Sequence, residues 1–193
     1  TVLPYDDSKG KPVTDYGRAS VAAKIKFSST EVKIGEHRPM LPVAFYDDSR
    51  QLITTYEGAT IESKEWSKLT LNAGRFWKTA TRESSDREDI YLFGDSPAQS
   101  SDGLNFAGAR YDFTPQFNTT YYFGQLEDIY KQHYAAAAYT MDLGNGYSLK
   151  SDLRYYNTQD EGAKLSGSLD NSSLGMMTAL SKGGHTFTAA YQR

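Results

Sequence analysis

The sequence predicts an all-β protein, a transmembrane antiparallel β-barrel, and three observations support this prediction. Apolar and polar residues alternate with a period of two through most of the chain. The connections between the alternating segments switch between short turns and longer loops. No stretch of the 193 residues reaches the roughly 18 apolar residues that a membrane-spanning helix requires.

The composition agrees with a barrel. Hydrophobic residues make up 38% of the chain, the mean hydropathy is -0.62, and 15 residues are tyrosines. A spanning barrel tolerates this composition because only every second residue of a strand meets lipid. The absence of cysteine excludes thiolate catalysis, disulfides and cysteine-bound metals. A net charge of -3 without a basic run makes nucleic acid an unexpected partner. No signal peptide is visible, so Thr1 is expected to begin a mature chain or a fragment.

The first four expected strands follow a loop at 1–15, which is rich in turn-forming residues. In the first strand, apolar side chains occupy the odd positions, and polar side chains occupy the even positions except Ala22, as a pleat with one lipid face requires. The same alternation continues past short turns at 28–30 and 64–68 and a loop at 38–53 that contains two prolines. It predicts strands at 18–27, 31–37, 54–63 and 69–77.

Six further strands follow a long loop at 78–103. The clearest of them sets Leu149, Leu153 and Tyr155 against Lys150 and Arg154, and it follows a hairpin of the Asn-Gly kind. The six strands are expected at 104–113, 117–127, 132–142, 147–157, 171–181 and 185–193. Short turns are expected at 114–116, 142–146 and 182–184, and longer connections at 128–131 and 158–170.

The segregation of loop lengths distinguishes a bacterial outer-membrane barrel from a soluble sandwich. Short turns gather at one end of the predicted strands and long loops at the other. Aromatic residues near the strand ends suit girdles at the two membrane interfaces: Tyr16, Phe27, Tyr111, Phe113, Phe117, Tyr139, Tyr147 and Tyr155.

The charged residues on the face opposite the lipid predict the function. A cation on the lipid face costs ~2–4 kcal/mol at mid-bilayer, so charged side chains are expected to line the interior. Cations outnumber acids there: Arg18, Lys24, Lys26, Lys33, Arg110, Lys150 and Arg154 against Glu31, Glu62, Asp112 and Asp152. Such a lining favours the passive passage of anions, because the cations offer successive weak sites for a carboxylate. For any single residue, a solvated face of a soluble sheet explains the charge equally well; the loop asymmetry favours a lumen.

The most specific segment of the sequence is Gln125-Leu126-Glu127-Asp128-Ile129-Tyr130, and shorter characteristic segments lie at 30–35, 41–43, 46–48, 71–75, 105–108, 169–171 and 183–187. In these segments the sequence resembles the OprD family of substrate-specific outer-membrane channels, also called the Occ carboxylate channels. The resemblance implies a monomeric, eighteen-stranded barrel in the outer membrane of a Gram-negative bacterium, of which this chain supplies about ten strands. It implies uptake of small carboxylates without energy input. It also implies that loop 78–103 folds inward and narrows the pore.

By the same resemblance, Arg75 and Arg110 lie near the eyelet positions, and Lys150 and Arg154 extend a basic track. The pore-lining set is completed from the inward face by Lys24, Lys26 and Tyr122. Strict alternation would turn Arg75 towards lipid, so its assignment requires a bulge or snorkelling at the strand end. The expected partners are small carboxylate solutes, outer-membrane lipid and lipopolysaccharide, with no cofactor and no metal. Because the chain ends in Tyr191-Gln192-Arg193 and not in an aromatic residue, an interior fragment is expected.

Two other functions remain open. A soluble β-sandwich could use its tyrosines as a carbohydrate-binding platform, and a barrel could carry a hydrolase site. The three histidines fit no metal spacing and no Gly-x-Ser-x-Gly motif is present, so no enzyme activity is expected. Acidic loop residues at 5–8 and 46–49 could hold Ca²⁺, although acidic turn chemistry explains them more readily.

Overall fold

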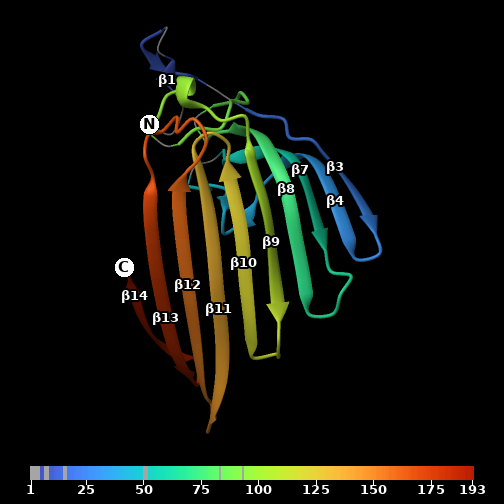
Figure 1. Cartoon of the computed structure of the whole chain (residues 1–193), viewed down its shortest axis with the longest axis vertical. Helices are drawn as coiled ribbons and strands as arrows, with labels where there is room; N and C mark the ends of the chain where they lie inside the picture. The colour runs from blue at the N-terminus through green and yellow to red at the C-terminus, as the bar shows by residue number, and fades with distance from the viewer. Residues whose placement is uncertain (1–4, 7–8, 15–16, 50–51, 83, 93) are drawn as a thin grey trace.

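The computed structural model describes the chain except for residues 1–4, 7–8, 15–16, 50–51, 83 and 93. Its long strands are β3 (Ala22–Phe27), β4 (Thr30–His37), β7 (Thr55–Ser63), β8 (Leu69–Ala80), β9 (Leu104–Asp112), β10 (Phe117–Leu126), β11 (Tyr130–Gly144), β12 (Tyr147–Asp160), β13 (Asp170–Lys182) and β14 (His185–Gln192). These strands form one antiparallel sheet in the order β14-β13-β12-β11-β10-β9-β8-β7-β4-β3. Figure 1 shows the sheet as a curved wall, and the ten predicted strands are confirmed.

The loop lengths segregate as predicted, with one exception. Short turns lie at the lower end of the wall in Figure 1, and the long connections at 38–54, 81–103 and 161–169 lie at the upper end. The upper-end connection expected at 128–131 is a tight turn at 127–129, so that part of the prediction was wrong. Glu161 of the next loop holds this turn, because its side chain accepts a hydrogen bond from the Asp128 amide and its own amide donates to the Ile129 carbonyl.

Three loop predictions need correction. The N-terminal loop contains a small hairpin, β1 (Tyr5–Asp6) with β2 (Lys11–Pro12), and the loop at 38–53 contains another, β5 (Met40–Leu41) with β6 (Ala44–Phe45). A short 3₁₀ helix, η1 (Pro97–Gln99), lies in the loop that follows β8. Tyr16, one of the expected girdle residues, lies outside the described residues.

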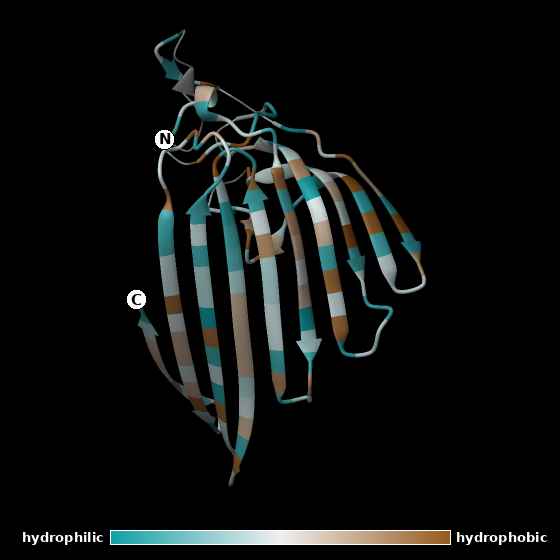
Figure 2. Ribbon diagram, viewed as in Figure 1, coloured by the Kyte–Doolittle hydropathy of each residue, from teal (hydrophilic) through white to brown (hydrophobic). Residues whose placement is uncertain are grey.

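One face of the sheet, called the apolar face here, carries large exposed hydrophobic side chains. Phe187 is 74% exposed, Phe27 68% and Leu153 46%. Strand register places the following residues together on this face: Ile25, Ile34, Ile61, Tyr121, Tyr139, Met141, Leu153, Tyr155, Leu174, Met176, Leu180 and Phe187. Figure 2 shows the corresponding bands of hydrophobic and hydrophilic residues along the long strands. An apolar surface of this extent requires a non-aqueous partner, and lipid satisfies that requirement.

Leu153→Arg is therefore expected to destabilise the full-length protein in a bilayer by ~2–4 kcal/mol, because Leu153 lies between Ala137 and Met176 in the middle of the apolar face. Urea unfolding in lipid vesicles measures the effect. Leu143→Arg, at the end of β11, is the matched control and should cost only about 0–1 kcal/mol near the interface. Equal losses in the two variants would contradict a lipid contact for Leu153.

The opposite face, called the wet face, is covered near the long loops by a compact core. Phe76 is 0% exposed, and Phe106 and Tyr122 are each 5% exposed. The β5–β6 hairpin packs over these strands, and an ideal Cβ on Gly124 would lie 2.9 Å from Cβ of Val43. The core cluster consists of Val43, Ala44, Phe76, Ile90, Leu104, Phe106, Tyr122, Leu126, Ile129 and Tyr134. Apolar loop residues thus line the upper part of the surface that the sequence predicts to be wet.

Three aromatic rings lie flat against the wet face, each over a glycine of the preceding strand. An ideal Cβ on the glycine would come within 2.6, 2.7 and 2.2 Å of the ring in the pairs Gly58–Phe76, Gly74–Phe106 and Gly108–Tyr122. Only a residue without a side chain leaves room for this approach. The glycines therefore keep the wall thin where the hairpin covers it.

Candidate functional site

The wet face of β9–β14, away from the hairpin, carries an exposed arginine. Arg154 on β12 lies between Ala136 on β11 and Gly175 on β13, so small neighbours leave its guanidinium uncovered. Among the described residues, no hydrogen bond or ion pair involves the Arg154 side chain. A hollow of about 390 Å³ surrounds it, lined by Asp152, Arg154, Tyr156, Ser173, Gly175, Met176, Met177, Ala190, Tyr191 and Gln192.

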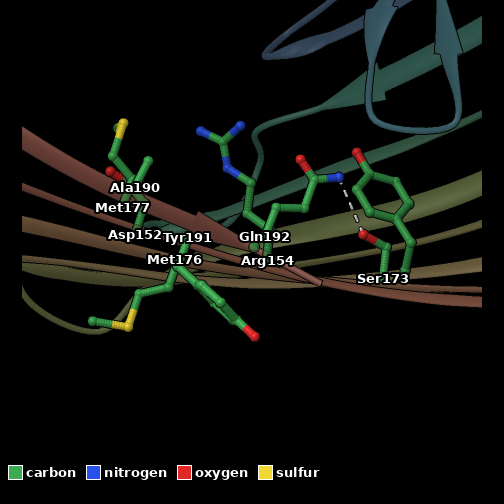
Figure 3. A pocket seen from close by; sticks show the side chains of 10 residues that line it. Asp152, Arg154, Ser173, Met176, Met177, Ala190, Tyr191 and Gln192 are labelled. Carbon is green, nitrogen blue, oxygen red and sulfur yellow. Dashed lines mark hydrogen bonds between the residues drawn. The ribbon is translucent and has the colours of Figure 1, made fainter.

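Figure 3 shows how the alternation divides this hollow. Arg154, Gln192 and Ser173 extend to one side of the sheet, whereas Met176 and Tyr191 extend to the other. Gln192 Nε2 donates to Ser173 Oγ at 3.3 Å. The polar residues of the hollow therefore belong to the wet face, together with Met177 and Ala190, whereas Met176 and Tyr191 belong to the apolar face.

Three other predicted pore residues also lie on the wet face, each beside an acid. Nitrogen–oxygen distances are 2.9 Å for Arg110–Asp112, 3.7 Å for Lys150–Asp152 and 3.0 Å for Lys24–Glu31. These cations are half-exposed, and such pairs contribute only about 0–1 kcal/mol each. Each of these cations can therefore leave its carboxylate partner and contact a solute anion at a small cost in free energy.

The register separates the basic residues into two groups. Arg110 and Arg154 share one row across the strands, three strand spacings or roughly 14 Å apart, and Lys150 lies on the same strand as Arg154, roughly 13 Å along it. Lys24 and Lys26 lie on β3, seven strands away from β12 in the sheet. Lys33 faces Lys24 directly. The structure therefore does not bring the predicted track together as one continuous line on the wall.

Tyr122 is packed in the core. Its hydroxyl accepts a hydrogen bond from Asn72 Nδ2 at 3.0 Å, and its ring covers Gly108. The same row continues through Tyr134 and Tyr156, whose ring centroids are 4.7 Å apart. Sequence reasoning selected Tyr122 alone because it treated each strand separately. Direct contact between Tyr122 and a solute stays a prediction.

Arg75 occupies the apolar face, in contrast to its expected inward position. It pairs with Asn105 in register, and its guanidinium forms a two-pronged pair with Glu127, in which Nη2 lies 2.9 Å from Oε2. A bulge does occur in β8, but the register shift lies beyond Arg75, opposite Glu57 and Gly58, and leaves its orientation unchanged. The geometry supports a clamp between β8 and the 127–129 turn, whereas the eyelet role of Arg75 stays a prediction that the register does not support.

The Arg75–Glu127 pair predicts an acid-dependent contribution to stability. Hydrogen bonds from Arg75 and then Asn105 hold the pKa of the Glu127 carboxyl below its usual value of 4.5. A lowered folded pKa means that the contribution is complete above the unfolded pKa and is lost as the pH falls through the folded pKa. The stabilities of the wild type and Glu127→Gln in urea unfolding should therefore differ at pH 7 and converge as the pH falls below the lowered pKa of Glu127. A difference that is independent of pH would contradict the ion pair.

Arg18, also expected inward, lies before β3 in an irregular segment at 17–21. β3 begins at Ala22 and not at 18, because the Glu36 amide donates to the Val21 carbonyl at 2.9 Å and Gly35 has a φ of +117°. The Arg18 side chain is buried beside Glu36. It therefore belongs to a polar cluster on the side of the apolar face and not to the wet face.

The loop after β8 reaches both sides of the wall. Short pairings join Thr79 to Glu88 and Ile90 to Ser101, which extend the sheet at its upper end. Ile90 is buried in the wet-face core with Val43 and Leu126, and Leu92 packs against that core. That this loop, expected at 78–103, narrows a pore is a prediction to which this placement lends support.

No group of three or more His, Cys, Asp or Glu residues suitable for a metal ion occurs in the part of the chain that the structure describes. Within the same residues, no helix has the length and apolar character needed to cross a bilayer. Two apolar residues of the candidate site were not predicted from the sequence: Val43 of the hairpin and Ile90 of the loop, both buried in the wet-face core. Their signal was weak, because single apolar residues in polar loops have no periodicity.

Comparisons with known proteins agree with this architecture. The family model described as outer membrane porin, OprD family, matches residues 1–193. The porin-like protein GalP of Pseudomonas putida is 36% identical over 193 residues, which is 100% of this chain and 46% of GalP. Porin D of Pseudomonas aeruginosa is 37% identical over 186 residues, 95% of this chain and 41% of Porin D. The chain thus spans less than half the length of these relatives.

Solved structures show the same relationship. Pseudomonas aeruginosa OccK1 (OpdK) superposes with a TM-score of 0.93 at 37% identity, covering 99% of this chain and 50% of that chain. OpdK has also been solved with vanillate. Pseudomonas aeruginosa OccK2 (OpdF), solved in complex with glucuronate, has a TM-score of 0.86 at 34% identity, covering 92% of this chain and 48% of that chain.

Proposed function

Because the chain belongs to the OprD family of outer membrane porins, we propose that the protein containing it is a channel for the passive, selective diffusion of small anionic carboxylate solutes. The chain forms part of an outer-membrane β-barrel of a Gram-negative bacterium. Since it spans about half of its relatives, the activity of the whole protein is part of the proposal. The channel acts as a monomer whose apolar face meets lipid and, in the outer leaflet, lipopolysaccharide.

The uncovered guanidinium of Arg154 is the observation that carries the proposal. Arginine presents a planar fork of donors that matches a carboxylate, and a guanidinium without an acid partner is available to a solute. Asp152 lies two residues before Arg154 on β12 and pairs with Lys150. It therefore lowers the positive electrostatic potential near Arg154 without forming an ion pair with it. Binding at such a site is weak enough for release, which conduction requires.

The spacing of the cations supports passage and not storage. Lys150 and Arg110 each lie roughly 13–14 Å from Arg154 and farther from one another, too far for one small carboxylate to contact two of the three cations. A solute therefore moves between separate weak sites. In a closed barrel, the second group with Lys24 and Lys26 faces the lumen from another part of the wall. The β5–β6 hairpin and residues 90–92 narrow the entrance above these sites.

The relatives point to the same substrate class. Vanillate and glucuronate, the compounds named with OpdK and OccK2, both carry a carboxylate. The wall offers the same chemistry, with cations for the carboxylate and tyrosines for a ring. The alternative of a soluble, carbohydrate-binding β-sandwich does not fit a single sheet whose apolar face is exposed. The relatives are porins and not enzymes, which disfavours the hydrolase alternative.

Planar-bilayer recordings of the full-length protein test this function. Under a potassium chloride gradient, the reversal potential should indicate a preference for chloride, and benzoate should reduce the chloride current reversibly. A neutral analogue of the same shape, benzamide, is the control and should leave the current unchanged. Cation preference, or equal effects of benzoate and benzamide, would overturn the proposal.

A further inference from the structure

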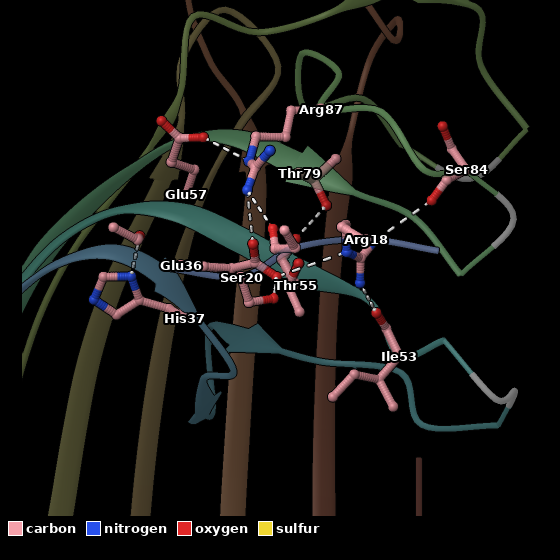
Figure 4. Close-up of polar contacts among 12 residues, drawn as sticks. Arg18, Ser20, Glu36, His37, Ile53, Thr55, Glu57, Thr79, Ser84 and Arg87 are labelled. Atoms are coloured by element: carbon pink, nitrogen blue, oxygen red, sulfur yellow. Dashed lines mark hydrogen bonds and ion pairs between the residues drawn. The ribbon is translucent and has the colours of Figure 1, made fainter. Parts of the chain in front are cut away.

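A cluster of charged residues surrounds the buried carboxylate of Glu36 at the upper end of the wall, on the side of the apolar face. Glu36 on β4 is only 7% exposed. Its carboxylate lies 2.9 Å from Arg87 Nη2 and 3.6 Å from Arg18 Nε, and it accepts a hydrogen bond from Ser20 Oγ at 2.6 Å. Figure 4 shows both arginines directed at Glu36 from different segments. The carboxylate therefore joins two parts of the chain that are far apart in sequence.

Arg87 is the residue that joins the two glutamates of this cluster. Its Nε lies 2.9 Å from Oε2 of Glu57 on β7, and its Nη2 also donates to the Ala19 carbonyl at 3.1 Å. Two arginines thus meet two glutamates, and the four formal charges balance. The side chains of Arg87 and Glu57 are 38% and 35% exposed, whereas that of Glu36 is only 5% exposed. Loss of Arg87 therefore removes one of the two cations that compensate a buried carboxylate, which is costly. The position of Arg87 is therefore strongly determined by the wall.

Because the backbone after Arg87 is extended, the position of Arg87 also determines where the following residues lie on the other side of the wall. The Thr79–Glu88 pairing holds the segment in an extended form beside β8, with hydrogen bonds of 2.9 and 2.7 Å. Successive side chains of an extended segment point to opposite faces. Arg87 accordingly pairs with Glu57, and Asp89 pairs with Lys78, on the side of the apolar face. Ile90 points the other way and is buried in the core of the wet face.

We propose that Arg87, held by Glu36 and Glu57, is a positioning residue for the channel constriction. From the apolar side it determines where residues 90–92 lie on the wet face, against Val43 and Leu126. Loss of its ion pairs releases this segment while the strand ladders of β4, β7 and β8 remain intact. The inference rests on the proposed channel function, but it concerns the geometry of the entrance and not the preference for anions.

Arg87→Gln in the full-length protein tests the proposal, with Lys78→Gln as the matched control. Lys78 pairs with Asp89 on the same segment at 2.6 Å, but both side chains are about half exposed, so this pair contributes little. In symmetrical salt, Arg87→Gln should increase the time spent in altered conductance states roughly 10-fold or more, because a partly buried pair is broken. Lys78→Gln should match the wild type. Arg87→Lys, which cannot bridge both glutamates, should lie between them.

A spectroscopic readout separates this proposal from the proposed function. The sequence has no cysteine, so Ala98→Cys in η1 takes a single spin label in the exposed part of the loop. The label should become more mobile with Arg87→Gln and stay unchanged with Lys78→Gln. Should Arg87→Gln not fold, Glu57→Gln removes one of its two partners and replaces it in both measurements. Label mobility and conductance states that match the Lys78→Gln control would overturn the proposal. A protein without anion preference that still shows the Arg87 effects would overturn the proposed function alone.

Discussion

Replacing Arg154 by alanine is expected to weaken benzoate binding in the channel on the order of 10-fold, and Arg154→Glu on the order of 100-fold or more. A unit charge at roughly 5 Å, with an effective dielectric constant of ~40 for a wet wall, contributes roughly 2 kcal/mol, and the glutamate doubles the change in charge. The unpaired state of Arg154 among the described residues is the reason for the large effect. The benzoate concentration that halves the chloride current measures it, and the reversal potential should shift towards zero in parallel.

Two further variants serve as comparisons for Arg154→Ala. Arg110→Ala should weaken the anion preference less than Arg154→Ala, since Asp112 already pairs with Arg110. Lys182→Ala removes a cation from the apolar face, where its ammonium lies 3.9 Å from the centroid of the Tyr147 ring, and should leave selectivity unchanged. Selectivity that is unaltered in both arginine variants would count against the proposed basic lining. A change in Lys182→Ala would show that net charge and not position controls selectivity.

Gly108→Ala is expected to lower the free energy of unfolding by ~1–3 kcal/mol, although it adds only one methyl group. The new Cβ would lie 2.2 Å from the Tyr122 ring, which is buried and held through its hydroxyl by Asn72. The ring can move only by breaking that hydrogen bond and displacing the core beneath the hairpin. Urea unfolding of the full-length protein in lipid vesicles gives the change in midpoint.

Gly175→Ala is the control for this prediction. Gly175 lies on the same wet face, but no atom comes within 4 Å of an added Cβ, so the substitution should be neutral or slightly stabilising. The double variant Gly108→Ala with Tyr122→Ala should lose less than the sum of its single variants, because the ring that clashes is gone. Equal effects of Gly108→Ala and Gly175→Ala, or strict additivity in the double variant, would contradict the ring-over-glycine packing.

The period-two pattern was sufficient to predict the strands. Each of the ten predicted strands overlaps an observed one, from β3 at Ala22–Phe27 to β14 at His185–Gln192. The reason is local: in a pleated strand the choice of face depends only on whether a position is odd or even, and lipid accepts only one kind of side chain. Leu153 and Arg154 are neighbours in sequence, and their opposite faces follow from that rule alone.

The pattern failed where a residue's environment comes from distant segments. Arg18 alternates correctly with Ala19 and Val21, yet Glu36 and the carbonyls of Ile53 and Thr81 hold it outside the wet face. Val43 gives no periodic signal, but it becomes part of the core because Gly124 leaves room for it. No rule about neighbouring residues contains these contacts.

The amino-acid order therefore determined the all-β class, the positions of the strands and the division into an apolar and a wet face. Tertiary structure decided which charged side chains are paired: within the described part of the chain Arg154 forms no ion pair, whereas Arg110 and Lys150 pair with aspartates and Arg75 pairs with Glu127 on the apolar face. The physical reason is the range of the forces involved. Alternation is a property of one strand, whereas the free energy of a charge depends on every group packed around it, including groups more than fifty residues away in the chain, as Arg75 and Glu127 are.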